Sequence, residues 1–106
     1  MRMLMTISVP TDIANDRVRS GSFGPTLSGI LAEMKPEAVY FTASPGGERS
    51  ALVILDMKDA SEMVKYSEPW FLAFGSAVNF EPVMTLPTCF RPFAARSNSS
   101  TAISES

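Results

Sequence analysis

The chain of 106 residues is long enough for one domain and too short for two of ordinary size. Apolar residues make up 45% of it, including seven Phe and seven Met, which is ample for a single hydrophobic core. The net charge is −2, with nine basic and eleven acidic residues spread along the chain, so we expect no basic surface for a phosphate backbone and no nucleic-acid partner.

Membrane signals and cysteine pairs are also missing from the sequence. No run approaches the ~18 apolar residues that a membrane helix needs. The apolar residues of segment 1–9 follow an alternating pattern, and the segment lacks the long apolar stretch and the cleavage site of a signal peptide. The single cysteine, Cys89, forms no internal disulfide and builds no metal site by itself. We expect a cytoplasmic protein without a membrane partner.

The chain contains no histidine, and this absence excludes several kinds of site. Ser-His-Asp triads, Cys-His dyads and His-ligated zinc or iron all require an imidazole. A haem held by a proximal histidine is excluded for the same reason. Carboxylates, tyrosines and lysines remain as acid–base groups. We expect neither a metal nor a cofactor.

The first half of the chain is predicted to form a strand and then two helical segments. Residues 2–9 alternate as a strand. One face of this strand carries Met3, Met5, Ile7 and Val9, and the other carries Arg2, Leu4, Thr6 and Ser8. A weakly amphipathic helix follows over about 12–19, and the glycines and serines of 20–24 interrupt it. A second helical segment starts near Pro25 and ends at Pro36. Its apolar stripe, spaced i, i+3, i+4 and i+7, comprises Leu27, Ile30, Leu31 and Met34.

Two strands joined by a tight turn are predicted over residues 37–44 and 49–57. The sequence PGGE at residues 45–48 is typical of a β-hairpin turn. The later strand carries ALVIL at residues 51–55 and is therefore apolar on both faces, as a central strand covered on both sides should be. One layer of helices covers one face only, so the pattern requires a second layer on the other face.

The last helix and strand complete the predicted fold. Asp59 and Glu62 are spaced as in a capping box, and Pro69 predicts a break or kink at the two residues before it. Residues 77–84 alternate as a fourth strand. Proline donates no hydrogen bond to a sheet, so Pro82 places this strand at an edge.

The order strand, helix, hairpin, helix, strand predicts an α+β fold of the ferredoxin-like βαββαβ type with a four-stranded antiparallel sheet. In this arrangement the first and third strands are central, and the second and fourth are edges. We expect a single domain over residues 1–93. The small polar residues of 94–106 predict a disordered tail.

Two stretches of the chain resemble a group of short, largely uncharacterised bacterial proteins of the dimeric α+β barrel type. One reads SGSFGPTL at residues 20–27 and continues as ILAEMKPEAVYF at 30–41. The other reads EPWFLAF at residues 68–74 and runs on to FEPVM at 80–84. The resemblance implies the fold and a homodimer in which two sheets pack face to face. It implies no particular activity.

Asp56 and Tyr40 are the candidate catalytic residues. Asp56 ends an otherwise apolar strand, and a carboxylate held in an apolar cleft can act as a base. The alternative for Asp56 is a solvated position at the end of the strand. Glu48 and Arg49, at the hairpin, are interpreted as surface charges.

The largest concentration of aromatic residues is Trp70, Phe71 and Phe74. Trp70 together with Tyr40 could wall a pocket between helices and sheet that suits a small apolar or aromatic ligand. Ordinary core packing at helical spacing is the alternative. Asn79 lies on the predicted edge strand. Its side chain either lines the pocket or is exposed to solvent. The candidate ligand-binding residues are Tyr40, Trp70, Phe74 and Asn79.

Three functions remain open at this stage. The first is a small-molecule-binding or accessory homodimer with an apolar pocket between helices and sheet. The second is a cofactor-independent monooxygenase or isomerase that uses Trp70, Asn79, Tyr40 and Asp56. The third is a structural interaction module whose apolar surface is all dimer interface. Convergence of the polar residues on one cavity beside Trp70 would favour the enzyme.

Overall fold

The computed structural model describes residues 1–87, which form one antiparallel sheet and three helices. The strands are β1 (Arg2–Val9), β2 (Ala38–Ala43), β3 (Arg49–Asp56) and β4 (Ala77–Pro82). Their order in the sheet is β2-β3-β1-β4, and every neighbouring pair is antiparallel. The predicted ferredoxin-like α+β fold is confirmed, with the first and third strands central and the proline-containing fourth strand at an edge.

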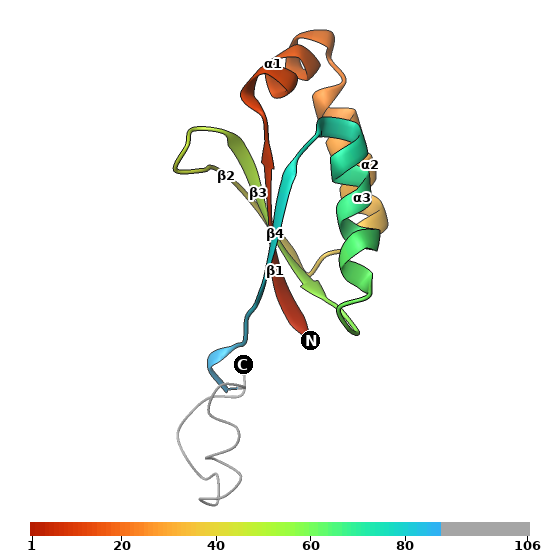
Figure 1. Ribbon diagram of the computed structural model, residues 1–106, viewed down its shortest axis with the longest axis vertical. Coiled ribbons are helices and arrows are strands. Elements are labelled where there is room, and N and C mark those ends of the chain that lie inside the picture. Colours follow the sequence, from red (N-terminus) through yellow and green to blue (C-terminus); the bar gives the residue numbers. More distant parts are fainter. Residues whose placement is uncertain (88–106) are drawn as a thin grey trace, which may run out of the picture.

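The helices gather on one side of the sheet. They are α1 (Thr11–Ser20), α2 (Phe23–Met34) and α3 (Glu62–Phe74). Helices α2 and α3 lie along one face, and the short α1 sits beyond one end of the sheet (Figure 1). Between α1 and α2, Gly21 adopts a φ of 80°, and its N–H donates to the carbonyl of Val18. A left-handed residue ends a helix in this way, and glycine adopts the conformation without strain.

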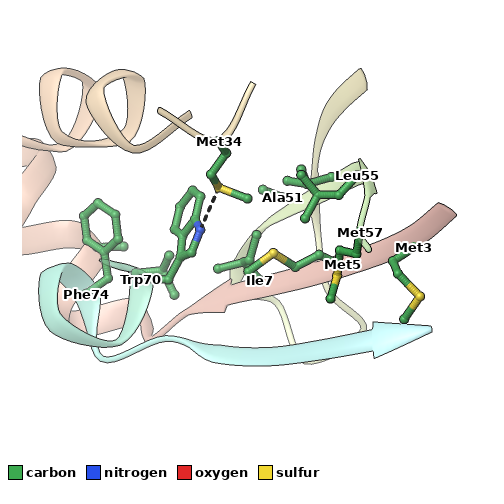
Figure 2. Packing of buried hydrophobic residues seen from close by; sticks show 12 residues of the cluster. Met3, Met5, Ile7, Met34, Ala51, Leu55, Met57, Trp70 and Phe74 are labelled. Carbon is green, nitrogen blue, oxygen red and sulfur yellow. Dashed lines mark hydrogen bonds between the residues drawn. The ribbon is translucent and has the colours of Figure 1, made fainter. Parts of the chain in front are cut away.

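The core lies between the sheet and the helices α2 and α3. The alternation of β1 and β3 sends one side chain in two toward the helices. The buried strand residues on this side are Met3, Met5, Ile7, Val9, Ala51, Val53 and Leu55. From the helices, Trp70 and Phe74 complete the core with exposed fractions of 0% and 1%. The indole N–H of Trp70 donates to the sulfur of Met34 at 3.3 Å, which joins α3 to α2 (Figure 2).

The two residues of the predicted capping box, Asp59 and Glu62, bond to the backbone at the start of α3, but Ser61 is the N-cap residue of this helix. The Asp59 carboxylate accepts hydrogen bonds from the backbone N–H and the hydroxyl of Ser61, and these bonds lower the pKa of Asp59. The side chain of Glu62 reaches back and accepts from the backbone N–H of Lys58 at 2.9 Å. Side chains therefore satisfy backbone donors in the turn before the helix, whereas the predicted reciprocal pairing of a capping box is not formed.

The predicted break before Pro69 is wrong, because α3 runs through this proline without interruption. A proline inside a helix removes one backbone hydrogen bond and costs about 3 kcal/mol. Tertiary packing outweighs that cost here. Ser67 precedes the proline, Trp70 and Phe74 follow it, and all three are buried on one side of α3. A break before Pro69 would turn Trp70 and Phe74 away from the side on which Ser67 is buried.

The other face of the sheet carries no helix within residues 1–87 (Figure 1). Leu4 and Ile54 are cross-strand partners on this face, and Leu52 pairs with Tyr40. Leu4, Leu52 and Ile54 are half-buried, whereas Tyr40 is 62% exposed. We call this side, with its apolar centre, the open face. The predicted apolar character of β3 on both sides is thus present in the structure.

Two predictions lie wholly or partly beyond the described residues. The end of the domain at residue 93 and the tail 94–106 both fall there and stay predictions. Within residues 1–87, every helix is too short or too polar to cross a bilayer. The same residues contain no group of three or more Asp, Glu or Cys side chains placed to hold a metal ion.

The substitution Trp70→Ala is expected to lower the free energy of unfolding by about 3–5 kcal/mol, because it leaves a cavity at the centre of the core. Chemical denaturation followed by circular dichroism measures this loss. Leu72→Ala, on the exposed side of the same helix, is the control and should change stability by about 0.5 kcal/mol or less. Equal effects of the two substitutions would contradict the burial of Trp70.

Candidate functional site

A cavity of about 260 Å³ lies between the helices and one end of the sheet. Its apolar lining comes from both layers. The residues are Ile7 and Val9 of β1, Ala51 of β3, Phe41 of β2, Phe23 and Leu27 of α2, and Trp70 of α3. The cavity is partly open to solvent. We call this space the helix–sheet cavity.

A small residue in the sheet accounts for the position of the cavity. Ala51 is the cross-strand partner of both Phe41 and Ile7, so this row carries a methyl group between two large side chains. The volume that a larger residue would fill at position 51 is left open. Phe41 is 60% exposed and lies on β2, an edge strand of the sheet. The exposed ring therefore forms part of the cavity mouth.

Three polar residues also line the cavity: Thr42, Arg49 and Ser50. The hydroxyl of Ser50 donates to the carbonyl of Glu48 at 3.1 Å and lies 3.2 Å from the hydroxyl of Ser8. The hydroxyl of Thr42 lies within 3.4 Å of the next carbonyl along the strand. Both hydroxyls therefore have protein partners. By the alternation of the strands they lie on the side of the sheet opposite to Phe41 and Ala51, so they do not face the cavity.

Arg49 is held at the cavity by a neutral side chain. Its Nη1 donates to the Oδ1 of Asn15, on α1, at 3.0 Å. Arg49 is exposed, as its place at the hairpin predicted, and it also lines the cavity. The alternation of β3 puts residue 49 on the same face as Ala51 and Val53, which is the face toward the helices.

Two of the predicted ligand-binding residues lie together on the helix side. The rings of Trp70 and Phe74 have centroids 6.1 Å apart, and Phe23 approaches Phe74 at 5.3 Å. Trp70 lines the helix–sheet cavity. Its indole N–H is engaged by Met34, so Trp70 offers the cavity an aromatic surface and no free donor.

The other two predicted ligand-binding residues point to the open face. In the register of the sheet, Tyr40 pairs with Leu52, Leu52 with Thr6, and Thr6 with Asn79. These residues share one side of the sheet, opposite to Ile7 and the helix–sheet cavity. Within one chain, Tyr40 and Asn79 therefore do not meet Trp70.

Asp56 lies at the far end of β3 from the cavity, roughly 20 Å from Arg49 at the strand's usual rise per residue. Its carboxylate is 3.0 Å from the ammonium group of Met1, and its side chain is 74% exposed. Nearby, Arg2 donates to the Glu37 carboxylate at 2.8 Å, and this hydrogen bond raises the pKa of Arg2. These surface pairs belong to the end of the sheet. The convergence of polar groups that would favour an enzyme is not found within residues 1–87.

Comparison with known proteins identifies the fold and no family. No protein-family model and no curated protein sequence matches the chain. One similar solved structure is the 5-chloro-2-hydroxyhydroquinone dehydrochlorinase from Burkholderia phenoliruptrix AC1100 in complex with 2,5-dihydroxybenzoquinone. It aligns with a TM-score of 0.59 at 16% sequence identity, over 79% of this chain and 94% of that chain. This similarity shows the ferredoxin-like α+β fold alone.

A second similar structure is a formyltetrahydrofolate deformylase from Pseudomonas putida KT2440, with a TM-score of 0.46 at 12% identity. The alignment covers 94% of this chain and 39% of that chain. The present chain thus spans well under half the length of the deformylase.

Proposed function

We propose that this protein binds a small planar apolar or aromatic molecule in the helix–sheet cavity. The observation that carries the proposal is the cavity itself, about 260 Å³ of space with an almost entirely apolar lining that includes Trp70, Phe23 and Phe41. Ligand pockets are typically concave and apolar, with a small number of polar groups that set orientation. The dehydrochlorinase of similar fold holds a small quinone in its solved complex, which is consistent with such a role.

The dimensions and lining of the cavity define the ligand. Its volume lies just below the usual range of about 300–1,000 Å³, so it suits a molecule of one or two rings. Each 100 Å² of apolar surface removed from water contributes roughly 2.5 kcal/mol before the costs of association. The exposed ring of Phe41 is apolar surface that a bound ring would cover.

The proposal stops at binding, since the candidate catalytic residues lie elsewhere. Asp56 and Tyr40 line neither the cavity nor a common site with Trp70. Of the polar lining residues, Arg49 has its side chain on the cavity side of the sheet, whereas the hydroxyls of Ser50 and Thr42 lie on the other side. Arginine stays protonated in proteins, and an unactivated hydroxyl is a weak base, so this set favours recognition over proton transfer.

We further propose that the protein is a cytoplasmic homodimer joined through the open faces of two sheets. The apolar centre of the open face is formed by Leu4, Leu52 and Ile54, which no helix of residues 1–87 covers. An exposed apolar patch favours association, and a two-fold axis through this patch would bring it against itself. The resemblance to dimeric α+β barrel proteins supports the same arrangement.

Titration with 2-naphthol is expected to shift the indole N–H signal of Trp70 in the ¹H–¹⁵N NMR spectrum. The chain has one tryptophan, so this signal is unambiguous, and Trp70 lines the cavity. Leu27→Phe should weaken 2-naphthol binding by roughly tenfold or more, because the larger ring occupies ligand space. The matched control Leu72→Phe, on the exposed side of α3, should bind as the unmodified chain does. Equal affinities of the two variants would place the ligand elsewhere.

Light scattering at micromolar concentration is expected to give the mass of a dimer. Leu52→Lys should yield a monomer, because it would bring a lysine from each protomer into one apolar interface. Leu72→Lys makes the same change on the opposite side of the molecule and should leave the dimer intact. Circular dichroism checks that both variants fold. A monomeric unmodified chain, or a dimeric folded Leu52→Lys variant, would refute the sheet-face dimer.

A further inference from the structure

The positive charge of Arg49 has no counterpart within the described part of the chain. The ion pairs found in residues 1–87 are Met1–Asp56, Arg2–Glu37, Arg19–Asp16 and Lys65–Glu62. Arg49 belongs to none of them, and its guanidinium contacts the neutral amide of Asn15. A cation beside an apolar cavity without a carboxylate partner is available to a charged ligand.

The guanidinium also has hydrogen-bonding capacity to spare. Arginine carries five N–H donors in a planar fork, and the bond to Asn15 engages one of them at Nη1. The hydroxyls of the other two polar lining residues, Ser50 and Thr42, lie on the opposite side of the sheet from Ala51 and Phe41. Arg49 is therefore the lining residue whose side chain has donors to spare, at the margin of an almost entirely apolar wall.

The register of the sheet places this donor at a suitable distance from the ring site. Arg49 and Ala51 lie on the same side of β3, two residues apart, which corresponds to about 6.6 Å along the strand. Phe41 lies opposite Ala51. A ring lying over Ala51 beside Phe41 would direct a substituent along the strand toward the guanidinium.

From these observations, we propose that the natural ligand of the helix–sheet cavity is an aromatic carboxylate whose anionic group pairs with Arg49. This inference rests on the proposed binding function and adds the chemical class of the ligand. A carboxylate matches the guanidinium fork with two parallel hydrogen bonds, and such charge-assisted pairs are stronger than neutral ones. Asn15 acts as a positioning residue that orients the guanidinium from α1 without neutralising it.

The experiment compares 2-naphthoate with its uncharged isostere 2-naphthamide, with the Trp70 indole N–H as the reporter. The unmodified chain should bind 2-naphthoate roughly tenfold more tightly than 2-naphthamide at low salt. Salt should reduce this preference, because the pair is near the surface. Arg49→Gln should remove the preference by weakening 2-naphthoate binding alone. The control Arg19→Gln removes an exposed arginine that pairs with Asp16 and should keep the preference.

A second variant tests the role of Asn15. Asn15→Asp keeps the shape of the side chain and gives Arg49 an internal carboxylate partner, which competes with the ligand. It should lower the affinity for 2-naphthoate by roughly tenfold and leave 2-naphthamide binding unchanged. A residue with a merely structural role would affect both ligands alike.

The outcomes separate this inference from the function on which it rests. If 2-naphthamide binds and Arg49→Gln leaves the preference for 2-naphthoate unchanged, Arg49 is not the recognition group and the inference is overturned. Equal binding of the two ligands by the unmodified chain overturns it as well. If neither ligand shifts the Trp70 signal, the binding function itself fails.

Discussion

Burial of Trp70 between the helices and the sheet is the contact on which the rest of the structure depends. The indole is fully buried, packs near Phe74 and donates to the sulfur of Met34, so one side chain joins α3 to α2 and both to the sheet. The same packing keeps α3 continuous through Pro69. Because the rigid indole also forms one wall of the helix–sheet cavity, the core and the candidate site share a boundary. Stability and ligand space are therefore coupled at this residue.

Periodicity in the sequence predicted the fold well, and it failed where tertiary packing decided the outcome. The alternation of β1 gave both its bounds and its buried face, and Pro82 gave the edge position of β4. At Pro69 the local rule predicted a break, but α3 keeps Ser67, Trp70 and Phe74 buried on one side, and this packing outweighs one lost hydrogen bond. The proline rule considers only neighbouring residues in the sequence and therefore does not include the energy of tertiary packing.

The candidate site was harder to predict, because a cavity is a missing volume and no sequence motif encodes it. The hypothesis that Trp70 and Tyr40 wall one pocket rests on their aromatic character and does not consider which side of the sheet Tyr40 faces. Phe41 lies on the helix side of β2, so its neighbour Tyr40 must point to the open face. The same alternation places Arg49 on the side of β3 that carries its buried apolar residues, and this could be read from the sequence. The alternation of side chains along a strand does not predict the open space beside Ala51, because this space depends on the distance between the helices and the sheet.

The two proposed surfaces lie on opposite sides of one sheet, so dimer formation and ligand binding do not compete for space. Strand β2 nevertheless takes part in both, because Tyr40 faces the proposed dimer interface and the adjacent Phe41 faces the cavity mouth. As an edge strand, β2 is hydrogen-bonded within the described sheet to β3 alone and is freer to shift than β1 or β3. A partner sheet that packs on Tyr40 would restrain this strand and with it the ring of Phe41. Any coupling between assembly and ligand affinity in this fold is therefore expected to pass through β2.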